Sequence, residues 1–219
     1  MFRGALEDDL DLKRYALARP YLYHLTHNAN VAHLREMRRL IPAATLLRLA
    51  GRLDLLRTPR RGSISVVVEG RTIVLRDQKP LHRGNLRLPN GFRFEDFVES
   101  LNERLFFWPG GVTKPIPHGI RHFEHYKAEN PAILRIELNA LLELNPTAVP
   151  RFCHYNSGSP RCSHGKKSPR SPRTFLTQSD FGGTASHVVE VTFESEIQLP
   201  QTTELGSSPR GPWRTLYRG

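Results

Sequence analysis

Residues of the kinds that bind ligands and transfer protons are scattered over several short segments of this chain. His24 and Thr26 lie in "YHLTH", and Glu190 lies in a late β-branched run; the other segments are "RDQKP" (76–80), "LNERLFFWP" (101–109) and "YNSGS" (155–159). Histidine and glutamate can act as general acids or bases, arginine makes bidentate bonds to phosphate, and aromatic rings stack on planar groups. These segments together could therefore form a binding or catalytic site.

Each member of this set also has a purely structural explanation. His24 could hydrogen-bond a turn, and Arg76 could pair with the aspartate that follows it. Phe106 and Phe107 are typical core residues, and Glu190 in an alternating strand could face solvent. Taken singly, these residues do not establish a function.

Several other kinds of chemistry lack the residues they need. The chain has no G-x-S-x-G segment, no Walker loop and no G-x-G-x-x-G segment, so the usual nucleophile and phosphate-binding motifs are absent. The potential metal ligands fit none of the usual zinc spacings, and we predict no metal site. These potential ligands are His24, His27, His33, Cys153, His154, Cys162 and His164.

The elements that would position these residues are predicted from periodicity. The clearest helix follows the apolar spacing of residues 94–105, and shorter helices are expected at 31–41, 43–51 and 119–129. Pro42 and Gly51 would end the first two of these short helices. Strands are expected at 21–26, 104–109, 132–138 and 187–199, with a hairpin or two short strands around Glu69 and Gly70. This pattern predicts an α+β fold with helices mainly in the N-terminal half.

The charge of the chain favours polyanionic partners. Lys and Arg total 32 against 21 acidic residues, a net charge of +11, so nucleic acid is the first partner to consider. Two cysteines make no disulfide framework and fit a reducing compartment. No apolar run is long enough to span a membrane, and the acidic start does not resemble a signal peptide. We therefore expect a cytoplasmic protein that does not enter membranes.

One segment differs in composition from the rest. Residues 157–173 contain five Lys or Arg, no acid and no large apolar side chain, so we expect a mobile basic loop there. We expect one domain over residues 1–205, which includes this loop, and a loosely ordered tail over 206–219.

The order of the segments resembles that of a family of uncharacterised bacterial proteins. Members read approximately Y-H-L-T-H, I-R-D-Q-x-P, L-N-x-R-V-F-F-W and N-S-G-S/T, followed by a late V-x-E strand. The present chain has "YHLTH", "LRDQKPL", "LNERLFFW", "YNSGS" and "VVEV" in that order, over roughly residues 21–194. That family resembles a distant branch of the ADP-ribosyltransferase fold, and this resemblance implies a mixed β-sheet core. By pattern it is similar to toxins of the DarT type, which modify bases of single-stranded DNA with NAD.

The resemblance implies that NAD is the substrate and assigns roles to the segments. His24, with Thr26 beside it, would contact the ribose of NAD. Arg76 would hold the pyrophosphate or a reacting group through its bidentate fork. Phe106 and Phe107 would form the wall on which nicotinamide stacks.

The later segments complete the implied site. Asn156 would belong to the NAD-binding residues, and Glu190 would be the catalytic carboxylate. Glu194 and Glu196 follow closely in the same region and are alternatives for that role.

The function implied is an NAD-dependent ADP-ribosyltransferase of toxin or defence type that modifies nucleic acid, DNA or RNA, with an antitoxin protein as a possible partner. Two other functions stay open on the same fold. One is a nucleic-acid-binding module without catalysis. The other is an NAD-dependent phosphotransferase that removes a phosphate from RNA.

Overall fold

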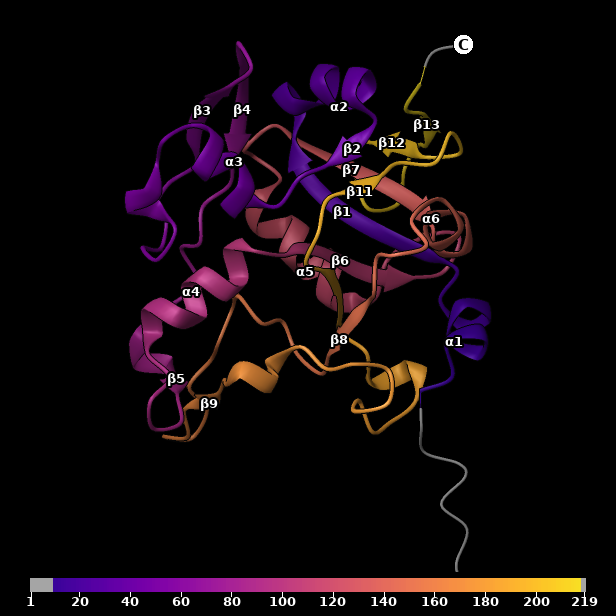
Figure 1. The fold of residues 1–219 in the computed structure, drawn as a ribbon. Helices are drawn as coiled ribbons and strands as arrows, with labels where there is room; N and C mark the ends of the chain where they lie inside the picture. Colours follow the sequence, from indigo (N-terminus) through magenta and orange to yellow (C-terminus); the bar gives the residue numbers. More distant parts are fainter. Residues whose placement is uncertain (1–9, 218–219) are drawn as a thin grey trace, which may run out of the picture.

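The computed structural model describes residues 10–217 of the chain (Figure 1). Its described part combines six α-helices with a large sheet, which confirms the α+β class. The helices are α1 (Leu12–Ala18), α2 (Val31–Met37), α3 (Ala43–Leu49), α4 (Phe94–Asn102), α5 (Pro117–Tyr126) and α6 (Leu138–Leu144). Residues 1–9, at the start of the predicted domain, and 218–219, at the end of the predicted tail, lie outside the described part.

The main sheet has seven strands in the order β13-β12-β7-β1-β6-β10-β8. Every neighbouring pair in it is antiparallel, so the expected mixed sheet is wrong for this core. The strands are β1 (Tyr21–His27), β6 (Leu105–Gly110), β7 (Pro131–Glu137), β8 (Arg151–Cys153), β10 (Glu190–Phe193), β12 (Glu204–Gly206) and β13 (Arg214–Thr215).

Three short two-stranded ladders lie outside the main sheet. The β3–β4 hairpin (Ile64–Val68 and Arg71–Leu75) turns at Glu69 and Gly70, as predicted. Strand β2 (Arg39–Leu40) pairs with β11 (Ile197–Gln198). Strand β5 (Leu86–Arg87) pairs with β9 (Ser168–Pro169), the single parallel pair within residues 10–217.

Apolar side chains cover both faces of the sheet. One cluster joins strand residues such as Leu134 and Val191 to Leu138 and Leu141 of α6 and to Tyr15 of α1. A second cluster packs other strand residues against α5, through Phe123 and Tyr126. Burial of these side chains is the main stabilising contribution to the fold.

The central strand β1 pairs with two neighbouring strands over different lengths. It pairs with β7 along its whole length, from Tyr21 to His27. With β6 it pairs only from Tyr21 to Tyr23, opposite Gly110 to Trp108. Beyond Tyr23 the ladder between the two strands ends, whereas the first half of β6 pairs with β10 along its other edge. The sheet is therefore forked at the position of His24.

The main helix and strand predictions are confirmed, with differences in detail. The strand expected at 187–199 is divided into β10 and β11, which pair with different strands. The helix predicted for 31–41 ends at Met37, because Arg38 adopts a left-handed conformation (φ 53°) and the next two residues pair with β11. A long-range ladder thus overrides local helical spacing. Helices α1 and α6, each of seven residues, were not predicted.

Parts of the predicted loop and tail contact the core. In the 157–173 segment, Ser157 and Arg170 are buried and β9 pairs with β5, whereas residues 161–167 are exposed. In the tail, β13 pairs with β12, and Leu216 and Tyr217 are buried. Composition missed these contacts because they are made by a few residues with no periodic pattern.

No helix within residues 10–217 is long and apolar enough to cross a membrane.

Candidate functional site

A cavity of about 270 Å³ lies at the fork between β1 and β6. Its volume is close to the lower end of the range for small-molecule sites. The lining residues come from the separating halves of the two strands, from α2, β4, α4 and α5, and from the 156–159 turn. Segments far apart in the sequence therefore share one cavity.

Six of the seven residues predicted for the site line this cavity. They are His24, Thr26, Arg76, Phe106, Asn156 and Glu190.

Phe107 is not part of the cavity lining, contrary to the expectation that it forms one wall with Phe106. Its side chain is 1 % exposed and packs edge-on against Phe193, with ring centroids 5.7 Å apart. Successive side chains of a strand point to opposite faces, so the rings of Phe106 and Phe107 lie on different sides of the sheet. Phe106 faces the cavity, and Phe107 belongs to the core.

His24 joins the two separating strands. Its Nδ1–H donates a hydrogen bond to the carbonyl oxygen of Phe106 at 3.0 Å. Burial lowers the pKa of His24 to about 4. The hydrogen bond to the Phe106 carbonyl opposes this shift, whereas the positive charge of Arg76 adds to it. The ring is therefore neutral at pH 7, and its Nε2 can accept a hydrogen bond, for example from a ligand hydroxyl.

Thr26 is positioned by Asn30, which precedes α2. The Asn30 amide donates to the Thr26 Oγ1 at 3.0 Å and to the Val74 carbonyl at 2.9 Å, and it accepts from the Val74 N–H at 2.8 Å. Asn30 is the residue before α2, but its side chain does not cap the helix. The Asn30 side chain instead connects β1 to β4. Because the Thr26 hydroxyl accepts the hydrogen bond from Asn30, it can donate its own proton to a ligand.

Arg76 lies in a largely aromatic surrounding. Its guanidinium is 3.7 Å from the ring centre of Tyr126, and one N–H donates to His122 Nε2 at 3.1 Å. Burial, followed by the charge of Arg76, lowers the pKa of His122 to about 3, so this acceptor is neutral. No carboxylate of residues 10–217 hydrogen-bonds the Arg76 guanidinium. Asp77 and Glu129 partly balance its charge, but its Nε–H has no hydrogen-bond partner within residues 10–217 and can bind an anion in the cavity.

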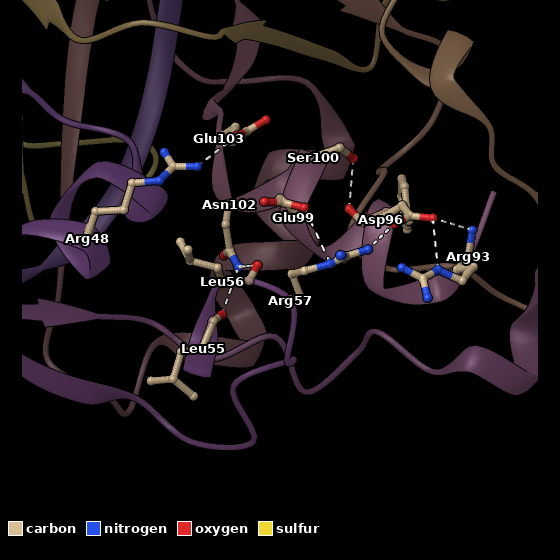
Figure 2. Close-up of polar contacts among 11 residues, drawn as sticks. Arg48, Leu55, Leu56, Arg57, Arg93, Asp96, Glu99, Ser100, Asn102 and Glu103 are labelled. Atoms are coloured by element: carbon tan, nitrogen blue, oxygen red, sulfur yellow. Dashed lines mark hydrogen bonds and ion pairs between the residues drawn. The ribbon is translucent and has the colours of Figure 1, made fainter. Parts of the chain in front are cut away.

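The "RDQ" and "LN" segments meet directly. Asn102 accepts from the Arg60 Nη1 at 2.7 Å and from the Gln78 amide at 3.2 Å. Its own amide donates to the carbonyls of Leu55 and Leu56, at 3.3 and 2.9 Å (Figure 2). Asn102 is 1 % exposed, so it joins α4 to the chain before β3 and holds the cavity wall. Arg60, which donates one of these hydrogen bonds, was not identified from the sequence because it belongs to none of the motif segments.

Ion pairs on the exposed side of α4 reinforce the same junction. Arg57 pairs with Asp96 and Glu99, and Arg48 pairs with Glu103 (Figure 2). Exposed pairs of this kind contribute little singly, so the buried amide of Asn102 is the stronger connection.

Of the three glutamates considered for the catalytic role, Glu190 lines the cavity and the other two do not. It is 4 % exposed, and its Oε2 accepts a hydrogen bond from the Ser157 N–H at 2.9 Å. Glu194 is exposed and pairs with Arg104, and Glu196 is exposed and pairs with Arg39. Burial raises the pKa of Glu190 to about 7, against the opposing effects of Ser157 and Arg170. A carboxyl group with such a pKa can exchange a proton near neutral pH.

Four arginines and two acids, Asp77 and Glu190, line the cavity. Two of the arginines are already paired with glutamates outside the lining, Arg39 with Glu196 and Arg104 with Glu194. The arginines are Arg39, Arg60, Arg76 and Arg104. Within residues 10–217, no group of three His, Cys, Asp or Glu side chains is arranged to hold a metal ion. Apolar, aromatic and cationic walls together suit a ligand with both a ring and phosphates.

The fold and the site define an α+β protein with a forked antiparallel sheet, whose cavity combines a neutral histidine, an arginine and a buried glutamate. Residues 20–203 match the model of the "Family of unknown function (DUF7002)", and the chain belongs to this family. Comparisons with curated proteins and with solved structures found no significant match.

Proposed function

We propose that this protein is an NAD-dependent ADP-ribosyltransferase that modifies nucleic acid. The observation that carries the proposal is the convergence of His24, Thr26, Arg76, Phe106 and Glu190 on one cavity. These residues were selected from the order of sequence motifs that resemble the ADP-ribosyltransferase fold. Motif order alone gives no reason for segments up to 166 positions apart, from residue 24 to residue 190, to meet in space.

Glu190 supplies the charge that the reaction needs. When the bond between ribose and nicotinamide breaks, positive charge develops on the ribose. A carboxylate beside the ribose stabilises this charge and accepts a hydrogen bond from a ribose hydroxyl. With a pKa near 7, Glu190 can also accept the proton of the incoming nucleophile.

The other lining residues bind NAD. The neutral His24 accepts from a ribose hydroxyl, and Thr26 lies two residues further along the same strand. Arg76 binds the pyrophosphate, since its charge has no carboxylate hydrogen-bond partner within residues 10–217. Phe106 forms the stacking surface for nicotinamide, and Asn156 closes the cavity from the opposite side of the fork.

The test is the release of nicotinamide from NAD by the purified protein, with and without single-stranded DNA or RNA. We expect Glu190→Gln to lower turnover at least 100-fold, as loss of a main electrostatic or general-base group does. Glu194→Gln is the matched control, because that side chain is exposed and close in the sequence. Turnover that is unchanged in Glu190→Gln would contradict the proposal.

The products distinguish the alternatives. A second candidate is the NAD-dependent removal of a phosphate from RNA, because Arg76 in the lining has no carboxylate hydrogen-bond partner within residues 10–217 and can bind phosphate. That reaction would give ADP-ribose phosphate when phosphorylated RNA is supplied. Absence of turnover, with nucleic-acid binding that is unaffected by Glu190→Gln, would identify a binding module. If the nucleic acid of the host cell is the acceptor, a neutralising antitoxin partner is expected.

A further inference from the structure

Arg170 is a buried arginine in the segment whose composition predicted a mobile loop. It is 2 % exposed, and its guanidinium lies 4.0 Å from the ring centre of Tyr155. Its Nη1 donates to the Ser168 Oγ at 2.9 Å and to the Pro169 carbonyl at 2.7 Å. A buried cation with no carboxylate hydrogen-bond partner in the described chain is costly, so its remaining contacts need an explanation.

Those remaining contacts are made with the turn that holds Glu190. The Arg170 Nη2 donates to the Asn156 carbonyl at 3.0 Å, and its Nε donates to the Ser157 carbonyl at 3.1 Å. The N–H of Ser157 donates to the Glu190 carboxylate at 2.9 Å. The Asn156 carbonyl and the Ser157 N–H belong to the same peptide group. That peptide group is therefore bound by a cation at its oxygen and by an anion at its nitrogen.

We infer that Arg170 is a positioning residue for Glu190, acting through the peptide group between Asn156 and Ser157. The guanidinium fixes two successive carbonyls and so aims the Ser157 N–H at the carboxylate. Hydrogen bonds in series polarise one another, which strengthens the bond to Glu190. The catalytic part of this inference rests on the proposed function, but the positioning itself does not.

Arginine is required here for its shape. Two carbonyls and an aromatic ring are bound at once by a planar fork, and a lysine ammonium cannot reproduce this arrangement. The ionisable groups that act on Glu190 are Arg170, which favours the carboxylate, and Cys153, which faces it on the neighbouring strand. Loss of Arg170 is therefore expected to favour the protonated form of Glu190.

The wild-type protein provides the first test, by NMR of the Ser157 amide. Its proton resonance should shift with pH as Glu190 ionises, and the same resonance should not titrate in Glu190→Gln. If the Ser157 amide does not respond to Glu190 in the wild-type protein, the inference is wrong. This measurement needs neither NAD nor activity.

Arg170→Lys provides the second test, with Arg173→Lys as the control, because Arg173 is exposed in the same segment. We expect Arg170→Lys to raise the pKa of Glu190, to increase hydrogen exchange of the Ser157 amide, and to lower kcat about tenfold with little change in KM for NAD. A folded Arg170→Lys protein with an unchanged Glu190 titration would overturn the inference. If the wild-type protein releases no nicotinamide but both NMR results hold, the proposed reaction fails and the positioning role stands.

Discussion

The carboxyl group of Glu190 is held in an environment that opposes its charge. Burial raises the pKa of this group from its ordinary value of 4.5 to about 7. The folded protein therefore keeps a proton that the unfolded chain releases between these two pH values. The free energy of unfolding has a contribution from Glu190 that is present below about pH 4.5 and is lost as pH rises to about 7.

Replacement by glutamine removes this pH dependence. We expect Glu190→Gln and wild type to have similar stability at pH 5, and the variant to be the more stable protein at pH 8. The difference at pH 8 should be of order 3 kcal/mol, from a pKa change of about 2.5. Urea unfolding of both proteins at the two pH values measures it. A constant difference across the pH range would contradict the raised pKa of Glu190.

The elements of the fold differ in how far their sequences determine them. Helix α4 and strand β1 were predicted because their apolar residues repeat with the period of the element. Glu190 and Thr192 of β10 alternate with apolar residues, which favoured a solvated face, yet both are buried. Strand β10 lies between β6 and β8, and Glu190 lines the cavity. The polar residues of this strand therefore face the cavity side of the sheet and are not exposed to solvent.

Adjacent residues of β6 give a matched pair for testing which face serves the site. Phe107→Ala should lower the free energy of unfolding by about 3–5 kcal/mol, because its ring is fully buried in the core. Phe106→Ala should lower it by about 1–2 kcal/mol, because this ring is partly exposed.

Binding of NAD should show the opposite pattern. Phe106→Ala should weaken NAD affinity about three- to tenfold, as loss of one stacking contact does, and Phe107→Ala should leave it unchanged. Chemical unfolding and isothermal titration calorimetry measure the two effects. Equal losses of affinity in both variants would show that Phe106 is not the stacking surface.

Most residues of the candidate site could be predicted from the sequence, whereas the residues that hold them in place could not. Motif order led to six residues that line the cavity. Arg60 and Arg170, which hold the cavity wall and Glu190, were missed because their partners are mostly amide and carbonyl groups of distant residues. Such partners leave no pattern in composition or spacing, so burial of these arginines appears only in three dimensions.

At the scale of the whole molecule, the net charge of +11 is unevenly placed. Residues 80–92 and 157–173 contain no acid, and β5 and β9 bring the two segments together at one end of the structure (Figure 1). Arg87, Arg161, Lys166 and Lys167 are exposed on them. Polyanions are expected to bind this region most strongly.

Removal of two of these charges should change the salt dependence of nucleic-acid binding. For single-stranded DNA, Lys166→Ala with Lys167→Ala should reduce the slope of log K against log salt by about 1.4. Arg48→Ala with Lys127→Ala is the control with the same change in net charge, since these cations pair with Glu103 and Glu124 elsewhere. Fluorescence anisotropy at several salt concentrations measures the slope. The same reduction in both double variants would show that binding is not localised to this region.

The short contact between β1 and β6 has a consequence for ligand binding. Only three residue pairs form the ladder between these strands. This contact lies between two groups of strands, β13-β12-β7-β1 and β6-β10-β8. His24 and Thr26 belong to the first group and Glu190 to the second. A ligand that fills the cavity contacts both groups, so its binding adds a connection between them where the ladder is short, and it should stabilise the folded protein.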